Sequence, residues 1–282
     1  MTFPKGDLTN LLFLLLAFGL LWLAYGLGGW LLVRKSGRTV NRLITEQDNL
    51  AVGCRLMGLI LGLALGLAGV MSYPSRGLTA DLAGLASSGL LMLALLLLAW
   101  LVNDRLLVRS VDNTSEVLQG NLAVGLVELG SFVASGLILK GAFSGSGTLL
   151  SGVAFFALGQ VSLVVFFLLM EWLSPYNDQG ELAKGNTALG LHLAGMLVSV
   201  GLVVAASVAG DFTYWTRDLG EFAYAVGKGM FLLLLLGWLT DRAFLRHTTM
   251  AREIAGQRNC AAVLLCLGVK LSLAVIIIFT VI

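Results

Sequence analysis

The chain has 282 residues, of which 58% are hydrophobic and 12% are charged, and its mean hydropathy is +0.92. In a soluble domain about a quarter of the residues are charged, so this composition excludes a soluble globular protein. It indicates an integral membrane protein whose main partner is the lipid bilayer. The net charge of +2, without a basic cluster interleaved with aromatic residues, predicts no nucleic-acid partner.

Eight apolar runs are long enough to cross the roughly 30 Å hydrocarbon layer, which takes about 20 helical residues. The runs cover residues 11–33, 50–71, 82–102, 122–143, 149–170, 187–209, 219–239 and 260–282. Helices are expected because they satisfy their own backbone hydrogen bonds in lipid. The short alternating segments of a transmembrane barrel are absent from the sequence. The predicted fold class is therefore an all-α membrane protein.

The first run and the cysteines give two further expectations. Only Lys5 and Asp7 carry charge before the first run, and no small-residue cleavage pattern follows it, so we expect a retained helix rather than a cleaved signal peptide. The three cysteines, Cys54, Cys260 and Cys266, lie inside apolar runs. Their spacing predicts neither a disulfide framework nor a metal site.

The positive charges of the loops predict the orientation of the helices. Eleven Lys and Arg residues fall in segments 34–48, 103–121, 171–186 and 240–259, against three in the N-terminal tail and the opposite loops. Cytoplasmic loops are enriched in Lys and Arg, so the first set is predicted to be cytoplasmic and both termini periplasmic.

Tryptophans support this orientation independently. Four of them end odd-numbered runs just before a predicted cytoplasmic segment: Trp30, Trp100, Trp172 and Trp238. Tryptophan is enriched at membrane interfaces. The pattern predicts an aromatic belt on the cytoplasmic side.

An internal repeat organises the chain. Close copies of the stretch Asn-Leu-Ala-Val-Gly begin at Asn49, Asn121, Asn186 and Asn259, each at the start of an even-numbered run. The first and third copies are 137 residues apart and the second and fourth 138. This spacing predicts two tandem four-helix units, residues 1–145 and 146–282, built from four repeated hairpins. All copies enter the membrane from one side, so the repeats are parallel.

Small residues recur at fixed distances after each repeat Asn. Nine residues on stand Gly58, Gly130, Gly195 and Gly268, and thirteen on stand Gly62, Ala134, Ser199 and Ser272. Pairs of small residues four apart let helix backbones approach closely in lipid. The even-numbered runs are therefore predicted to be the inner, contacting helices. The same features also suit a homodimer.

The repeat Asn has two interpretations. Asn is a favoured N-cap, which accepts a hydrogen bond from an unpaired amide of the first helical turn. Alternatively, four symmetry-related Asn side chains ring a cytoplasmic mouth. An acidic residue precedes each Asn, namely Glu46, Glu116, Glu181 and Glu253. These are either solvated loop charges near a helix start or part of a cytoplasmic docking surface.

Five ionisable residues inside the runs are the candidates for a polar pathway: Arg55, Glu128, His192, Lys228 and Lys270. A charge in the membrane normally faces protein, a partner or water. Arg55, Glu128 and His192 lie about 9–11 Å along their helices. An Arg55–Glu128 ion pair at this depth either fixes helix register or lies on a pathway.

The remaining candidates also have alternatives. His192 is either a hydrogen-bonded packing residue or a proton carrier. Lys228 and Lys270 have no evident partner on their own helices, so they either face an anionic ligand or are kept neutral by burial. Enzyme signatures are absent: the sequence has no His-Glu-x-x-His run, no phosphate-binding Gly-Lys-Ser/Thr loop and no nucleophile motif. We therefore expect a protein that is not an enzyme and has no metal or cofactor.

The pattern of Asn121-Leu122-Ala123-Val124-Gly125, with Glu116 before it and Gly130 after it, resembles the YjfL-like family of bacterial inner-membrane proteins. That family is a domain of unknown function with a unit of about four helices, so two tandem units would cover nearly the whole chain. The resemblance implies a bacterial inner-membrane location and an envelope-related role. It implies no catalytic residues. The fourth copy departs from the pattern at Ala262 and Val263.

Two functions fit these observations. The first is a channel or transporter for a small ion or solute, with a polar pathway along the even-numbered helices. The second is a non-transporting membrane scaffold or envelope-stress partner, in which the same charges are structural and the cytoplasmic segments dock other proteins.

Overall fold

The computed structural model describes residues 6–34, 36–72 and 75–280. Within these residues the chain forms helices joined by turns. Lys5 and Lys35, counted above among the tail and loop charges, lie outside them. The helices are α1 (Asp7–Val33), α2 (Val40–Thr45), α3 (Leu50–Val70), α4 (Leu78–Leu106), α5 (Asn113–Leu118), α6 (Leu122–Ala142), α7 (Leu149–Leu173), α8 (Asp178–Ala183), α9 (Thr187–Val208), α10 (Trp215–Phe244), η1 (a π-helical turn, Arg252–Gly256) and α11 (Cys260–Thr280).

All eight predicted membrane helices are confirmed in number and order. Four of them are longer than their apolar runs, namely α1, α4, α7 and α10, and the difference is largest for α4 and α10. α4 has 29 residues and α10 has 30, which at about 1.5 Å per residue makes each about 43–45 Å long. Each is thus longer than the roughly 30 Å hydrocarbon layer is thick, and each begins with a turn that carries an acidic residue, Asp81 or Asp218.

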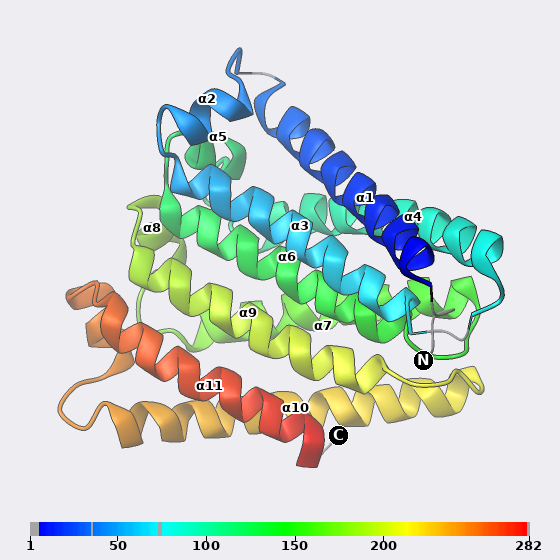
Figure 1. Cartoon of the computed structure of the whole chain (residues 1–282). Helices are drawn as coiled ribbons and strands as arrows, with labels where there is room; N and C mark the ends of the chain where they lie inside the picture. The colour runs from blue at the N-terminus through cyan, green and yellow to red at the C-terminus, as the bar shows by residue number, and fades with distance from the viewer. Residues whose placement is uncertain (1–5, 35, 73–74, 281–282) are drawn as a thin grey trace.

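The four helices that begin with the repeat motif form one layer in chain order, α3, α6, α9 and α11 (Figure 1). The other four cover it: α4 packs against α3 and α6, α7 against α6 and α9, and α10 against α9 and α11, while α1 packs against α3 and α4. The start of α1 and the end of α11 lie at the same end of the bundle (Figure 1). The fold is therefore two tandem parallel units in one continuous layered bundle.

Small residues explain why the repeat helices lie so close together. A methyl group at Gly130 would lie 2.5 Å from the Ala194 Cα, and one at Gly58 would lie 2.8 Å from the Leu129 Cα. A methyl group at Gly195 would overlap the Leu267 side chain. The inner position predicted for the repeat helices is thus observed in α3, α6 and α9. In α11, at the edge of the layer, a methyl group at Gly268 would meet no described atom within 4 Å.

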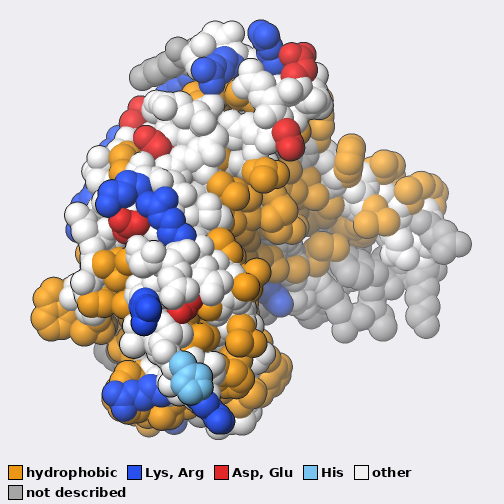
Figure 2. All heavy atoms as spheres, turned by 90° about the vertical axis from the view of Figure 1, so that its left-hand side faces the viewer, with side chains coloured by type: hydrophobic (Ala, Val, Ile, Leu, Met, Phe, Trp, Pro, Cys, Tyr) orange, Lys and Arg blue, Asp and Glu red, His pale blue; other side chains and the backbone are white. Residues whose placement is uncertain are grey.

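The short helices α2, α5, α8 and η1 gather at the end of the bundle where the repeat Asn residues lie (Figure 1). Figure 2 looks onto this end and shows Lys and Arg side chains over it, bordered by apolar side chains. Three of the tryptophans in the predicted belt lie on the surface of the bundle, since Trp30, Trp172 and Trp238 are 57%, 79% and 50% exposed. Trp100 instead turns inward and packs on Arg55, with 4.6 Å between the guanidinium carbon and the ring centroid.

Candidate functional site: intramembrane polar clusters and two cavities

The repeat Asn residues are N-caps that also join neighbouring copies. In every copy the side-chain oxygen accepts a hydrogen bond from the backbone amide three residues on, at 3.1–3.3 Å. In the first three copies the side-chain amide also donates to a backbone carbonyl of the next copy: Asn49 to Val117, Asn121 to Leu182 and Asn186 to Ile254. Because these contacts follow the layer, the four Asn residues form a row rather than a ring around one opening.

Acidic residues complete three of these caps. Glu116, Glu181 and Glu253 each accept a hydrogen bond from the Asn of their own copy. Glu46 pairs instead with Arg42. Hydrogen bonds from Lys184 and Asn186 hold the pKa of Glu181 below its ordinary value, and those from Thr248 and Asn259 do the same for the pKa of Glu253. Glu181 and Glu253 are therefore charged structural acceptors at neutral pH.

The predicted Arg55–Glu128 ion pair is present and buried. Arg55 Nη1 lies 3.2 Å from Glu128 Oε1, and the two side chains are 5% and 6% exposed. Arg55 also contacts the Thr114 hydroxyl of α5 at 3.4 Å. The Trp100 and Phe132 rings line the space beside the pair, which leaves cavities of only about 10 and 20 Å³. In this unit the intramembrane charges are closely packed.

A polar seam continues from this pair towards the middle of the membrane, between α4, α6 and α7. Asn103 donates hydrogen bonds to Ser131 (2.8 Å) and to Gln160 (3.4 Å), and the Gln160 oxygen also accepts one from Ser135 (3.2 Å). All four side chains are buried. Buried polar groups of this kind, in contact with one another across three helices, are the elements from which a path for a polar solute is built.

The second unit places its charges around an open cavity. Lys270 Nζ lies 2.9 Å from Asp241 Oδ1, with side chains 14% and 29% exposed. With His192 they line a cavity of about 340 Å³ whose other walls are largely apolar, including Phe166, Met170, Met196 and Leu233. Since Asp241 is close to the end of α10, the Lys270 side chain extends towards that end of the bundle to reach it.

Equivalent positions explain the difference between the two units. An offset of 137 residues relates Arg55 to His192, Trp100 to Gly237 and Asp104 to Asp241; an offset of 138 relates Phe132 to Lys270 and Glu128 to Cys266. The rings of Trp100 and Phe132 fill the first unit, and the equivalent residues of the second unit are a glycine and a flexible lysine. The second cavity is the space that these rings would occupy.

Lys228 does not join either group, contrary to its predicted place on the pathway. It lies on α10, outside the repeat layer, and is exposed. Its ammonium lies 5.5 Å from the centroid of the Tyr224 ring, which is itself 70% exposed. The prediction was wrong because membership of an apolar run does not show which face of a helix carries the charge.

The predicted pathway along the even-numbered helices is also corrected. These helices touch through their backbones at Gly58, Gly125, Gly130 and Gly190, which leaves no room for a solute between them. The polar side chains that they carry point instead towards the covering helices.

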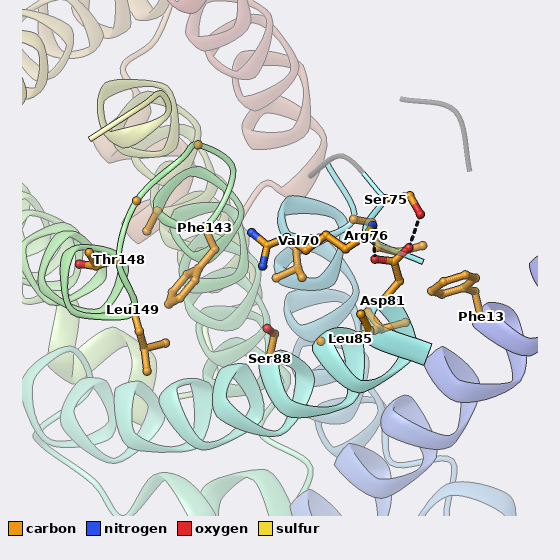
Figure 3. Close-up of a pocket in the computed structure, with 16 residues that line it drawn as sticks. Phe13, Val70, Ser75, Arg76, Asp81, Leu85, Ser88, Phe143, Thr148 and Leu149 are labelled. Atoms are coloured by element: carbon orange, nitrogen blue, oxygen red, sulfur yellow. Dashed lines mark hydrogen bonds between the residues drawn. The ribbon is translucent and has the colours of Figure 1, made fainter. Parts of the chain in front are cut away.

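A further cavity of about 300 Å³ lies at the end of the bundle opposite the repeat Asn residues (Figure 3). It is lined by the starts of α4 and α7 and the end of α6, and includes Arg76, Asp81, Ser88, Phe143 and Leu149. We call it the outer cavity. Along α6, about 10 Å of helix separates Ser135 of the polar seam from Ala142 at the cavity, and Leu139, which lies between them, is fully buried.

Several of these residues were not singled out from the sequence. Asn103, Gln160 and Asp241 are polar residues within or at the ends of apolar helices, and an inventory of all intramembrane polar residues, not only ionisable ones, would have included them. Arg76 was counted only as a loop charge. No sequence pattern indicates that its side chain enters a cavity.

Comparison with known families agrees with the internal repeat. Residues 5–143 and 145–281 each match the family described as Domain of Unknown Function (DUF350). The match supports two tandem units. The narrower YjfL-like assignment is not named by this match and stays a prediction.

One curated relative is a UPF0719 transmembrane protein from Aquifex aeolicus (strain VF5). It is 27% identical over 179 residues, which are 61% of this chain and 64% of the relative. The chain thus spans slightly less than two thirds of that protein. No solved structure matches the chain.

Proposed function

Because the chain belongs to the DUF350 family and carries two tandem units in eight membrane-spanning helices, we propose that it passes a small ion or polar solute across the membrane along the seam between α4, α6 and α7. The observation that carries this proposal is the line of buried, mutually hydrogen-bonded side chains at Asn103, Ser131, Ser135 and Gln160. The outer cavity lies at one end of the seam, and Arg55 and Glu128 at the other.

On this proposal the observed packing is a closed state of the pathway. Leu139, together with Met92 and Leu96 of α4, has 0% exposure, so apolar packing separates the outer cavity from the polar seam. Conduction would require these side chains to move apart. Hydrophobic constrictions that open and close in this way are an established means of gating channels.

The proposal includes a location and an orientation. The resemblance to the YjfL-like family favours a bacterial inner membrane, and the Lys and Arg distribution favours both termini in the periplasm, which would put the outer cavity on the periplasmic side. It also includes a non-enzymatic role and a homodimer that pairs through the exposed Gly268 face of α11.

Flux through the purified protein in liposomes tests the proposal. We expect uptake of at least one small cation, anion or neutral polar solute, and we expect Gln160→Leu to reduce it about tenfold, the factor given by about 1.4 kcal/mol of lost stabilisation of the solute. Ser87→Ala is the matched control, because Ser87 is an exposed polar residue of α4 whose hydroxyl donates to carbonyls of its own helix.

A second candidate function is a non-transporting scaffold. It is favoured by the close packing around Arg55 and Glu128 and by the Asn contacts that join the copies. If folded wild-type protein passes none of a broad panel of solutes, and a soluble partner binds the short helices in stoichiometric amount, the scaffold replaces the transporter.

A further inference from the structure

The outer cavity combines one cationic side chain with apolar walls. Its lining includes Phe13, Val70, Leu85, Phe143 and Leu149, and its volume of about 300 Å³ reaches the lower end of the range of small-molecule sites, about 300–1,000 Å³. Such sites are mostly apolar, with a few polar groups that fix the ligand. The polar groups here come from the loop before α4 and from its first turns.

Arg76 is the group that is available to a ligand. Figure 3 shows its side chain crossing Val70 and ending with the guanidinium inside the cavity, near Phe143 and Ser88. Among the described residues, none hydrogen-bonds or ion-pairs with this guanidinium; the backbone amide of Arg76 donates to Asp81 Oδ1 at 2.9 Å. A guanidinium offers five donors in a planar fork that matches a phosphate or carboxylate.

Asp81 does not neutralise this site by pairing with it. One oxygen of its carboxylate accepts a hydrogen bond from the Ser75 hydroxyl and the other accepts one from the Arg76 amide. These bonds hold the turn that begins α4, and among the described residues they leave the guanidinium without a hydrogen-bond partner, although the charge of Asp81 acts on it. Ser88 lies about two turns after Asp81 along α4 and adds a hydroxyl to the cavity wall.

The equivalent region of the second unit lacks each of these features. Offsets of 137 residues place Thr213, Phe222 and Ala225 where the first unit has Arg76, Leu85 and Ser88. Four rings, those of Phe155, Phe212, Trp215 and Phe222, pack together there at centroid distances of 4.9–6.5 Å. The cavity that remains is about 90 Å³ and is lined by Asp211, Asp218 and Glu221. The cationic cavity is thus a property of the first unit and is not required by the shared fold.

We propose that the outer cavity binds an anionic phospholipid, whose phosphate is held by Arg76 and Ser88 and whose acyl chain lies along Phe13, Leu85 and Leu149. The location favours a lipid over a free anion, because the cavity lies at the ends of membrane helices, at the level of the lipid phosphates, and its walls are apolar. This binding does not depend on the passage of a solute. A lipid seated there lies at the outer end of the polar seam.

Native mass spectrometry of the full chain, titrated with phosphatidylglycerol or with phosphatidylcholine of the same acyl chains, tests this proposal. We expect one phosphatidylglycerol to bind preferentially, and Arg76→Gln to weaken it about tenfold, which corresponds to about 1.4 kcal/mol. Arg217→Gln is the matched control, because Arg217 lies at the same end of the bundle but pairs with Glu221 at 2.7 Å. It lines neither the outer cavity nor the cavity of about 90 Å³ in the second unit.

A second variant keeps the test decisive if Arg76→Gln does not fold. Leu85→Phe introduces the residue that the chain itself has at the equivalent position, Phe222, and is expected to fill the cavity and remove the bound lipid. Equal binding of both lipids, or unchanged binding in folded Arg76→Gln and Leu85→Phe, would overturn the proposal. Displacement of the lipid by millimolar inorganic phosphate alone would identify a free-anion site instead.

Discussion

The two tandem units have the same arrangement of helices, but the large cavity of one unit lies at the opposite end of the bundle from the large cavity of the other. The first unit is filled around Arg55 and Glu128, where its cavities are about 10 and 20 Å³, and open at the outer cavity, about 300 Å³. The second unit is open around Lys270 and Asp241, about 340 Å³, and nearly filled at the other end, about 90 Å³. A few side chains at equivalent positions account for this difference, so a duplicated backbone has acquired two different sites.

The largest expected effect concerns the inner charge pairs. Glu128→Gln should destabilise the protein by about 3–5 kcal/mol, because it leaves Arg55 buried without its partner. Lys270→Met should cost about 1 kcal/mol or less, since its pair with Asp241 is partly exposed beside an open cavity. Unfolding of the purified variants in detergent measures both.

The double variant Arg55→Met/Glu128→Leu is the control for this prediction, because it removes both charges and should recover part of the stability. Similar losses in Glu128→Gln and Lys270→Met would show that the first pair is no more buried than the second.

An intermediate effect is expected where neighbouring repeat helices touch. Gly130→Ala should cost about 1–3 kcal/mol, since the added methyl group would press on the backbone of α9 and force the helices apart. Gly268→Ala occupies the same repeat position in α11 and should be neutral or stabilising by about 0.5–1 kcal/mol, the difference in helix propensity. Thermal unfolding of both variants is the measurement. A loss in Gly268→Ala together with a change in oligomeric state would support the homodimer.

The smallest effect concerns the short helices that correspond in the two units, α2 and α8. α2 begins with Val40, and α8 begins with Asp178. Burial raises the pKa of Asp178 to about 6. The folded carboxyl therefore binds its proton more tightly than the unfolded one, whose pKa is near 3.8. Stability contributed by the proton is present at low pH and is lost as the pH rises from about 4 to about 6.

Asp178→Asn should therefore stabilise the protein at pH 7 by about 1–2 kcal/mol, because the neutral amide avoids the cost of burying a carboxylate. Melting temperatures of wild type and variant, recorded between pH 4 and pH 8, measure this difference. Curves that stay parallel over that range would contradict a raised pKa at Asp178. The Ser174 hydroxyl, which donates to Asp178 at 2.7 Å, remains in both proteins.

The sequence by itself determined the class of fold, the eight membrane helices and the tandem parallel repeat, and the Asn caps were one of the two interpretations that it allowed for the repeat Asn residues. These features are periodic or local: an apolar run must be helical in lipid, and an Asn at a helix start bonds within its own first turn. The Arg55–Glu128 pair was also predictable, because equal depth in neighbouring repeat helices places the two charges at one level.

Only the tertiary structure decided which face of each helix carries each polar group. It showed that the repeat helices touch through their backbones, that Lys228 lies outside the bundle interior, that Lys270 reaches Asp241, and that Arg76 enters a cavity. The physical reason is that packing in a membrane depends on shape complementarity between helices far apart in sequence. The Trp100 ring fills a space in the first unit, and Gly237 leaves the equivalent space open in the second. The walls of that space come from several helices, so it exists only once the helices are assembled.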